Sequence, residues 1–162
     1  MSLELHLRHQ ASVAWLLAEW AHAIDDDRVE FIAELMRPDG RYTVSSRFNV
    51  SRGLPLSIID ARSAAQLRDR IKSMRLANIY QPQNYRHVIS AIQVLGQDES
   101  GCLQVRSSFA VFRTLESSGD SVYFAGGRCD DVIDVQGPLP RFAQRHFIYD
   151  SRAVETLMVI PL

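Results

Sequence analysis

Four long segments of alternating apolar and polar residues in the second half of the chain constrain the fold more than any other feature. They cover residues 85–95, 102–115, 121–135 and 140–150, with GQDESG, ESSGD and QGP between them. A period of two is typical of strands with one buried face, and glycine-rich breaks are typical of turns. The pattern therefore predicts a meander of long antiparallel strands.

The first residues of the chain show a helical period instead. An apolar stripe recurs at steps of three and four and predicts a first helix of about 18 residues; its members are Val13, Leu16, Leu17, Trp20 and Ile24. The aspartates 25–27 end this helix. Asp27 and Glu30 have the spacing of a capping box, which predicts a second, shorter helix containing Phe31, Ile32, Leu35 and Met36.

Residues 38–40 read as a turn, and the alternating segments 42–50 and 54–60 follow it. Ser63 is the expected N-cap of a third helix. Its predicted inward residues are Ala64, Leu67, Ile71 and Met74, and its predicted outward residues are Arg68, Lys72 and Arg75.

Length and composition favour one globular domain spanning residues 1–162. The chain has 162 residues, of which 46% are hydrophobic, enough for a real core. Its apolar runs are shorter than the roughly 18 residues of a membrane span, and its start lacks the basic-then-apolar order of a signal peptide. We expect an α+β cytoplasmic protein in which a curled sheet folds over the N-terminal helices.

Charge is balanced overall and uneven along the chain. The formal net charge is −1, which argues against a nucleic-acid partner. Residues 37–86, however, hold 10 basic and 3 acidic side chains, and 17 of the 18 basic residues are Arg. Codon usage can explain the preference for Arg over Lys, and internal neutralisation can explain the basic excess. The alternative for both is an interface, where the planar guanidinium group is favoured.

The Cys and His residues do not form a recognisable metal site. Cys102 and Cys129 fall in strand-like segments and are expected as buried free thiols. The paired Cys and His motifs of a Rieske cluster are absent. The histidines are His6, His9, His22, His87 and His146; of these, His6 and His9 share a helical face and are expected to be solvated.

Polar residues on the predicted strands offer two interpretations. With a period of two, His87, Arg128, Asp130 and Arg145 could meet in one polar pocket inside the curled sheet. His87 beside Asp130 would then be capable of acid–base chemistry. The other interpretation is a structural network of paired groups. Gly126 and Gly127 indicate a bulge or strong bend there, and there is neither a phosphate-binding loop nor a nucleophile elbow.

The chain resembles the β (small) subunits of aromatic-ring-hydroxylating dioxygenases, the Rieske-type oxygenases. The matching stretches are LPLSIIDARSAAQLRDRIKSM, YRHVISAIQVL, VRSSFAVFRT, VYFAGGRCDDVIDVQGPLPRFAQRHFIYDSR and the apolar tail LMVIPL. The pair Arg86-His87 before a strand and the run from Gly127 to Asp130 are the most informative motifs.

This resemblance implies a cone-shaped fold of the nuclear-transport-factor-two-like kind. In that family the α subunit carries the Rieske [2Fe-2S] cluster and the mononuclear iron, and the β subunit usually carries no cofactor or metal. The α and β chains assemble as a hexamer of three each, in which the β chains meet as a trimer. The implied reaction inserts both atoms of O₂ into an aromatic ring, with electrons supplied from NAD(P)H through partner proteins.

The leading hypothesis is therefore a non-catalytic structural subunit. The expected structural network is Arg86, His87, Arg128, Asp130 and Arg145, and the interface guesses are Arg52, Arg62 and Arg68. One alternative is a stand-alone isomerase or dehydratase on the same cone, with His87 and Asp130 as acid–base residues. Another is a small-ligand-binding or dimerisation module.

Overall fold

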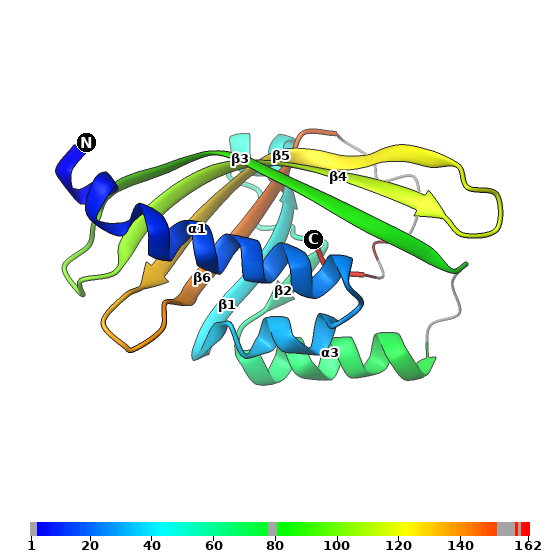
Figure 1. Cartoon of the computed structure of the whole chain (residues 1–162), viewed down its shortest axis with the longest axis horizontal. Coiled ribbons are helices and arrows are strands. Elements are labelled where there is room, and N and C mark those ends of the chain that lie inside the picture. The colour runs from blue at the N-terminus through cyan, green and yellow to red at the C-terminus, as the bar shows by residue number, and fades with distance from the viewer. Residues whose placement is uncertain (1–2, 78–80, 152–157, 159) are drawn as a thin grey trace.

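A computed structural model describes residues 3–77, 81–151, 158 and 160–162. Helices and strands follow the expected order, with helices concentrated in the first half (Figure 1). The elements are α1 (Leu3–Asp25), the 3₁₀ helix η1 (Val29–Ala33), β1 (Met36–Ser46), α2 (Arg47–Ser51), β2 (Ile59–Ala61), α3 (Ala64–Ala77), β3 (Gln83–Gln97), β4 (Leu103–Leu115), β5 (Ser121–Asp134) and β6 (Arg141–Tyr149).

The described strands form one curved sheet of six strands in the order β2-β1-β6-β5-β4-β3. Strands β3 to β6 pair in sequence as the predicted antiparallel meander. Strand β1 joins β6 in parallel, so the sheet is mixed. Helix α1 runs across the sheet, with η1 and α3 below it in Figure 1. This is the expected α+β cone.

The core lies between the helices and the enclosed face of the sheet. The whole predicted stripe of α1, from Val13 to Ile24, is buried. Trp20 lies at its centre, and its ring is 5.3 Å from the ring of Tyr42 and 5.4 Å from that of Phe142. Because these aromatic residues come from α1, β1 and β6, one indole side chain connects the helix to the middle of the sheet.

The predicted second helix is wrong in extent and in its cap. Residues 29–33 form a single 3₁₀ stretch without a side-chain cap, and Met36 already begins β1. Asp27 has a φ of 56°, and its carboxylate lies 2.7 Å from Arg75 Nη1 instead of capping the helix. Glu30 also binds Arg75, at 2.8 Å. A partner on α3 therefore replaced the local capping interaction.

Two further local predictions need correction. Residues 38–40 lie within β1, where the register with β6 shifts between Met36 and Arg41, and so form an irregularity rather than a turn. The segment 42–50 is strand only to Ser46, whose hydroxyl accepts the Asn49 N–H at 3.1 Å and caps α2. The segment 54–60 contributes only the short β2.

The third helix is as predicted. Ser63 Oγ accepts the Gln66 N–H at 3.2 Å, and the predicted inward residues of α3 are all buried. In β5 the pairing shifts so that Phe124 is the extra residue opposite β4. The irregularity expected at Gly126 and Gly127 thus lies just before them. Gly127 instead allows a close approach of backbones, because an added Cβ would collide with the Ile148 carbonyl of β6.

Candidate functional site

The interior of the cone is occupied by the last residues of the chain. Leu162 is fully buried, and its carbonyl accepts the indole N–H of Trp20 at 2.8 Å. The Tyr42 hydroxyl accepts the Leu162 N–H at 3.0 Å and lies 3.3 Å from the Leu162 carbonyl oxygen. Burial raises the pKa of Tyr42, so the phenol stays protonated and able to donate. The polar groups of the interior therefore bind the chain itself.

The most distinctive polar pair lies at the edge of the sheet, between α1 and β3. Asp25 Oδ1 is 2.6 Å from His87 Nδ1, and the two side chains are 2% and 0% exposed. The Asp25 carboxylate also accepts the backbone N–H of His87 at 2.9 Å, and Arg86 Nη1 lies 3.6 Å from it. One buried carboxylate thus serves both the imidazole and an unpaired N–H of an edge strand.

Sequence reasoning missed Asp25, which it used only as a helix terminator. A signal was available, because the C-terminal end of a helix carries partial negative charge and disfavours an aspartate. Asp25 is the last residue of α1 and is followed by two more aspartates. An acidic residue in that position needs a compensating donor, and β3 supplies it through His87.

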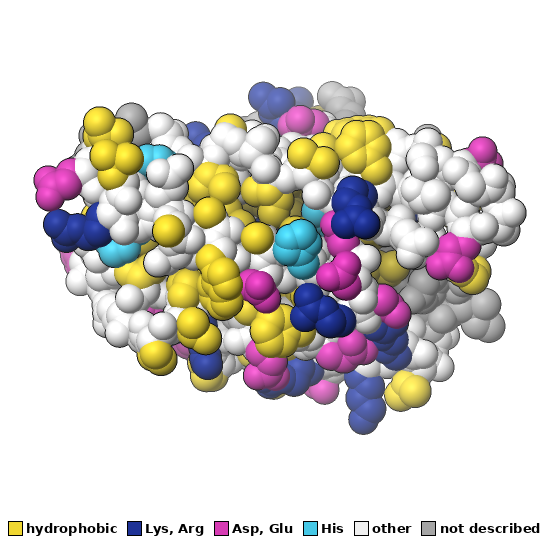
Figure 2. Space-filling view, viewed as in Figure 1, with side chains coloured by type: hydrophobic (Ala, Val, Ile, Leu, Met, Phe, Trp, Pro, Cys, Tyr) yellow, Lys and Arg dark blue, Asp and Glu magenta, His cyan; other side chains and the backbone are white. Residues whose placement is uncertain are grey.

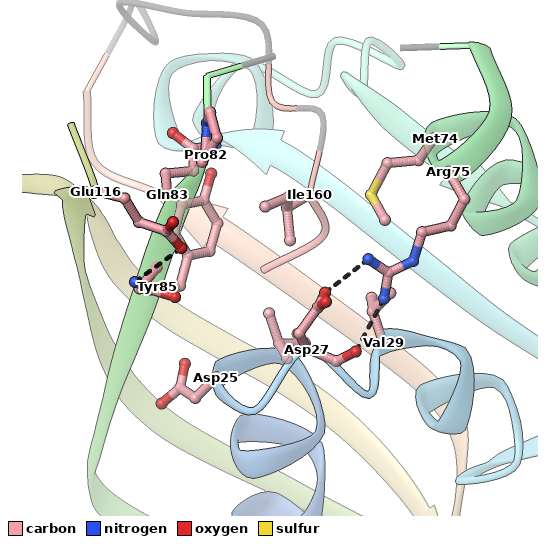
Figure 3. A pocket seen from close by; sticks show the side chains of 12 residues that line it. Asp25, Asp27, Val29, Met74, Arg75, Pro82, Gln83, Tyr85, Glu116 and Ile160 are labelled. Atoms are coloured by element: carbon pink, nitrogen blue, oxygen red, sulfur yellow. Dashed lines mark hydrogen bonds and ion pairs between the residues drawn. The ribbon is translucent and has the colours of Figure 1, made fainter. Parts of the chain in front are cut away.

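Two hollows lie on either side of this pair. The larger, of about 450 Å³, is lined by Asp25 together with Asp27, Arg75, Tyr85 and Glu116, among others. Figure 3 shows Asp25 on one side of this hollow and the Asp27–Arg75 ion pair on the other. The smaller, of about 230 Å³, lies between α1 and β3 and is lined by His87. The larger hollow is therefore charged, whereas the smaller is lined mainly by apolar residues.

The predicted single pocket of His87, Arg128, Asp130 and Arg145 does not form. In the register of β5 with β6, Arg145 stands opposite Asp131, and His146 opposite Asp130. Residues directly opposite share a face, and a step of one residue changes the face. Arg145 therefore points into the core with Asp131, whereas Arg128 and Asp130 lie on the opposite face.

Arg145 and Asp131 form a fully buried ion pair. Their Nη1–Oδ2 distance is 2.9 Å, and both side chains are 0% exposed. The guanidinium carbon lies 4.5 Å from the ring centres of Phe142 and Phe147. Burial raises the pKa of Asp131 to about 6, although Arg145 opposes the shift. Arg145 was named in the predicted network, but Asp131, the residue that it binds, was not.

The outer face carries a separate polar group. Asp130 accepts from Arg106 Nε at 3.0 Å and from Arg128 Nε at 3.1 Å. His146 Nε2 lies 3.0 Å from the Ser45 hydroxyl, and burial lowers the pKa of this imidazole. The Arg106–Asp130 and His146–Ser45 contacts connect neighbouring strands, and Asp130 is on the wrong face to reach His87.

The three interface guesses are exposed and also have partners within the chain. Arg52 stacks over Phe48, with its guanidinium carbon 3.8 Å from the ring centre. Arg62 pairs with Asp60 at 3.3 Å, and Arg68 with Glu34 at 3.0 Å. Part of the Arg excess is thus neutralised internally, and an interface role for these residues stays a prediction.

The remaining candidate ligands are dispersed. Cys102 and Cys129 are buried free thiols, as predicted. His6 Nδ1 accepts the Val94 N–H at 3.3 Å, so His6 is not simply solvated. Among the residues that the structure describes, no cluster of three His, Cys, Asp or Glu could hold a metal ion. No helix within the described ranges is long and apolar enough to cross a membrane.

The fold places the chain among the α+β cone proteins, and similarity to known proteins identifies the family. The family model described as "Ring hydroxylating beta subunit" matches residues 14–156. The chain therefore belongs to the ring-hydroxylating dioxygenase β-subunit family.

Relatives support this membership. The chain is 33% identical to the anthranilate 1,2-dioxygenase small subunit of Burkholderia cepacia, over 86% of this chain and 85% of the relative. It is 30% identical to a β subunit (beta 2) of the terephthalate 1,2-dioxygenase terminal oxygenase component of a Comamonas species, over 95% and 99% of the two chains.

Solved structures agree on the fold. The β subunit of a protein assigned as an aromatic-ring-hydroxylating dioxygenase from Novosphingobium aromaticivorans superposes with a TM-score of 0.87 at 28% identity, covering 98% of this chain and 99% of that one. Naphthalene 1,2-dioxygenase gives a TM-score of 0.72 at 18% identity, over 94% and 84% of the chains. This second likeness concerns the fold alone.

Proposed function

We propose that this chain is the non-catalytic β subunit of an aromatic-ring dioxygenase and supports assembly of the catalytic α subunit. The observation that carries the proposal is the family match over residues 14–156, together with relatives that are small or β subunits of dioxygenases. The burial of Leu162 against Trp20 is in keeping with a structural role for this part of the interior.

In this proposal the α subunit is catalytic and this chain is structural, so the cofactors are assigned to the α subunit. The Rieske cluster and the mononuclear iron belong to the α subunit, which performs the dihydroxylation, and this chain contributes no metal ligands. The complex is a hexamer of three α and three β chains. Within this chain, the Asp25–His87 pair ties α1 to β3, and the Asp131–Arg145 pair ties β5 to β6.

An exposed aromatic patch supports a partner-binding role. Phe112 of β4 and Tyr123 of β5 stand opposite each other, with ring centres 6.2 Å apart. They are 43% and 60% exposed. We call Phe112 and Tyr123 the hairpin patch. Exposed aromatic residues of this kind are enriched in the anchors of protein interfaces.

Co-expression with the α subunit tests this function. A tag on this chain should retain the α subunit, and the purified complex should contain iron and dihydroxylate an aromatic compound. Tyr123→Glu should reduce the retained α subunit at least about tenfold if the patch anchors it. Leu139→Glu changes a similarly exposed residue outside the patch and is the matched control. An α subunit that is equally soluble, iron-loaded and active without this chain would contradict the proposal.

The acid–base alternative loses its predicted pair. Asp130 is bound by Arg106 and Arg128 on the outer face, whereas His87 is bound by Asp25. A reaction inside the cone through His87 and Asp130 therefore has no geometric support.

A further inference from the structure

We propose that an exposed ridge between α2 and β2 binds the end of the β4–β5 hairpin of a second copy of this chain. We call the ridge the basic ridge, and its members are Arg52, Leu54, Leu56, Ile58 and Arg62. We call its occupant the acidic hairpin end, and its members are Glu116, Asp120 and Val122. This inference deepens the proposed function and rests on it for the presence of several β chains in one complex.

Three aliphatic side chains give the basic ridge an apolar surface. Leu54, Leu56 and Ile58 stand at every second position and are 43%, 64% and 45% exposed. The backbone beneath them is held in place, because Asn49 Nδ2 donates to the Leu56 carbonyl at 3.0 Å and the Ile58 N–H donates to the Val44 carbonyl at 2.8 Å. Single apolar residues are ordinary on a protein surface, whereas a fixed group of this kind is typical of an interaction site.

The basic ridge also carries an excess of positive charge. Asp60 accepts from Arg41 Nε at 2.9 Å and from Arg62 Nε at 3.3 Å, so two guanidinium groups share one carboxylate. Arg52 stacks over the Phe48 ring instead of pairing with a described carboxylate. Because three arginines meet one aspartate, the ridge retains positive charge that suits an acidic partner.

The chain carries the complementary chemistry at the acidic hairpin end. Glu116 and Asp120 are exposed, and Glu116 accepts from Asn84 Nδ2, a neutral donor, at 3.4 Å. Among the residues that the structure describes, neither carboxylate has a basic partner. Val122 is 41% exposed and adds an apolar side chain. The hairpin extends beyond the end of α1 in Figure 1, and Figure 2 shows Asp or Glu side chains at that end of the molecule.

The two surfaces lie apart in one chain, so a contact between them requires two copies. The basic ridge precedes β2, at one edge of the sheet, whereas the acidic hairpin end joins β4 to β5, which β1 and β6 separate from β2. A contact between two different surfaces of identical chains repeats head to tail and closes into a ring when the rotation allows it. Such a ring is the form in which the β chains are expected to assemble.

Carbodiimide cross-linking tests the contact between copies. Lys72 is the only lysine of the chain, so Arg52→Lys introduces an amine into the basic ridge and keeps its charge. The reagent joins amines to carboxylates in direct contact, and it is applied to a mixture of ¹⁴N and ¹⁵N chains. We expect mass spectrometry to find peptides of mixed isotope content that join position 52 to Glu116 or Asp120. Arg8→Lys, at an exposed position of α1, is the control and should give no link to either carboxylate.

Charge reversal tests whether the two surfaces recognise each other. Arg52→Glu with Arg62→Glu reverses the ridge, and Glu116→Arg with Asp120→Arg reverses the hairpin end. Each pair of substitutions should raise the dissociation constant of the assembly at least about tenfold, measured by light scattering over a concentration series. The chain with all four substitutions should return to within about threefold of the wild type, because the charges are again opposite.

The apolar part of the contact has its own variant. Leu56→Ser should raise the dissociation constant at least about tenfold, whereas Leu139→Ser, at a similarly exposed position outside the basic ridge, should not change it. Thermal melting of each variant shows whether the chain is still folded.

Three results would overturn the proposal: a wild-type chain that stays monomeric, cross-links from position 52 that lie within one chain or reach other carboxylates alone, and equal dissociation constants for Leu56→Ser and Leu139→Ser. So would a folded chain with all four charge substitutions that assembles no better than either pair. Retention of the α subunit is measured separately, so a wild-type chain that binds the α subunit and stays monomeric on its own would contradict this inference and leave the proposed function standing.

Discussion

At the scale of single residues, the buried polar groups of this protein are specified by contacts between distant parts of the chain. Asp25 and His87 are 62 positions apart, yet the carboxylate binds two donors of the same residue. His87 ties the edge strand to the end of α1 through these two contacts, and its role as an architectural residue stays a prediction.

A double-mutant cycle on Asp25 and His87 measures that connection. Asp25→Ala leaves the imidazole and the N–H of His87 without an acceptor and should lower the free energy of unfolding by about 1–3 kcal/mol. His87→Ala should cost less in the Asp25→Ala background than in the wild type, because the contact is already lost. Urea unfolding gives both free energies.

Arg86→Ala is the control. It removes a 67% exposed side chain that lies 3.6 Å from Asp25, and it should change the free energy of unfolding by about 0.5 kcal/mol or less. Additive single effects would contradict the coupling.

Asp131 gives a pH-dependent prediction. Its pKa is raised from 3.8 to about 6, so the folded state holds this proton more tightly than the unfolded state. The contribution of Asp131 to stability is therefore greatest below about pH 4 and declines as the pH rises through about 6. Asp131→Asn, which cannot ionise, should gain stability relative to the wild type over this interval, by up to about 3 kcal/mol. Thermal unfolding of both proteins between about pH 4 and 7 tests the sign. A relative loss would mean that Arg145 lowers the pKa instead.

At the scale of elements, close backbone approach and tail docking shape the cone. Strands β5 and β6 come together where Gly127 faces the Ile148 carbonyl, and a side chain there would force them apart. The tail contributes in a different way, because its backbone is bound by the side chains of Trp20 and Tyr42. Both features allow the curved sheet and the helices to close around one core.

Gly127→Ala should destabilise the protein by roughly 1–3 kcal/mol, because its Cβ would collide with backbone atoms of β6, which cannot move without disturbing the sheet. Gly96→Ala is the control, since an added Cβ in that β3 position meets no atom within 4 Å. That substitution should change stability by no more than about 0.5 kcal/mol. Calorimetric melting of the two variants compares them directly. Equal effects would show that the approach of β5 to β6 is not limiting.

Deletion of residues 160–162 should open the interior. The loss of buried Leu162 and of the hydrogen bonds to Trp20 and Tyr42 should cost about 3–5 kcal/mol. Trp20 is fully buried and Trp15 is 39% exposed, so a Trp15→Phe background makes fluorescence report on Trp20. The emission of Trp20 should shift to longer wavelength as water enters. An unchanged spectrum and melting temperature would mean that the tail does not hold the core together.

At the scale of the whole molecule, charged and aromatic side chains are exposed on the surface. Arg62 and Arg68 pair with acidic residues of their own chain but remain 74% and 51% exposed. Exposed pairs of this kind contribute little to folding and more to specificity. They therefore remain available to a second copy or to the α subunit.

The chain made alone should self-associate, with a trimer as the expected species. Light scattering after size exclusion at low and high salt measures the mass and its dependence on charge. A triple substitution of Arg52, Arg62 and Arg68 to Gln should shift the equilibrium toward monomer, whereas Arg8→Gln, in an exposed pair on α1, should not. A monomer of 18.4 kDa at tens of micromolar protein would exclude self-assembly and leave the α subunit as the partner for this surface.

The sequence by itself determined the features that repeat within one element. The period of two in the second half specified β3 to β6 within a few residues, and the apolar stripe from Val13 to Ile24 specified the buried face of α1. The sequence also predicted Ser63 as the N-cap of α3 and the buried residues of that helix. Such patterns are local, since they depend only on backbone geometry and on which side chains share a face.

Only the tertiary structure decided which faces meet. The register of β5 with β6 put Arg145 opposite Asp131 rather than Asp130, and a one-residue difference moved the predicted network to the other face. The parallel β1–β6 pairing, the Asp25–His87 contact and the burial of Leu162 against Trp20, 142 positions away, likewise join segments remote in sequence. The periodicity of a segment defines which of its residues share a face. Which other segment packs against that face depends on how the whole chain closes around a single core.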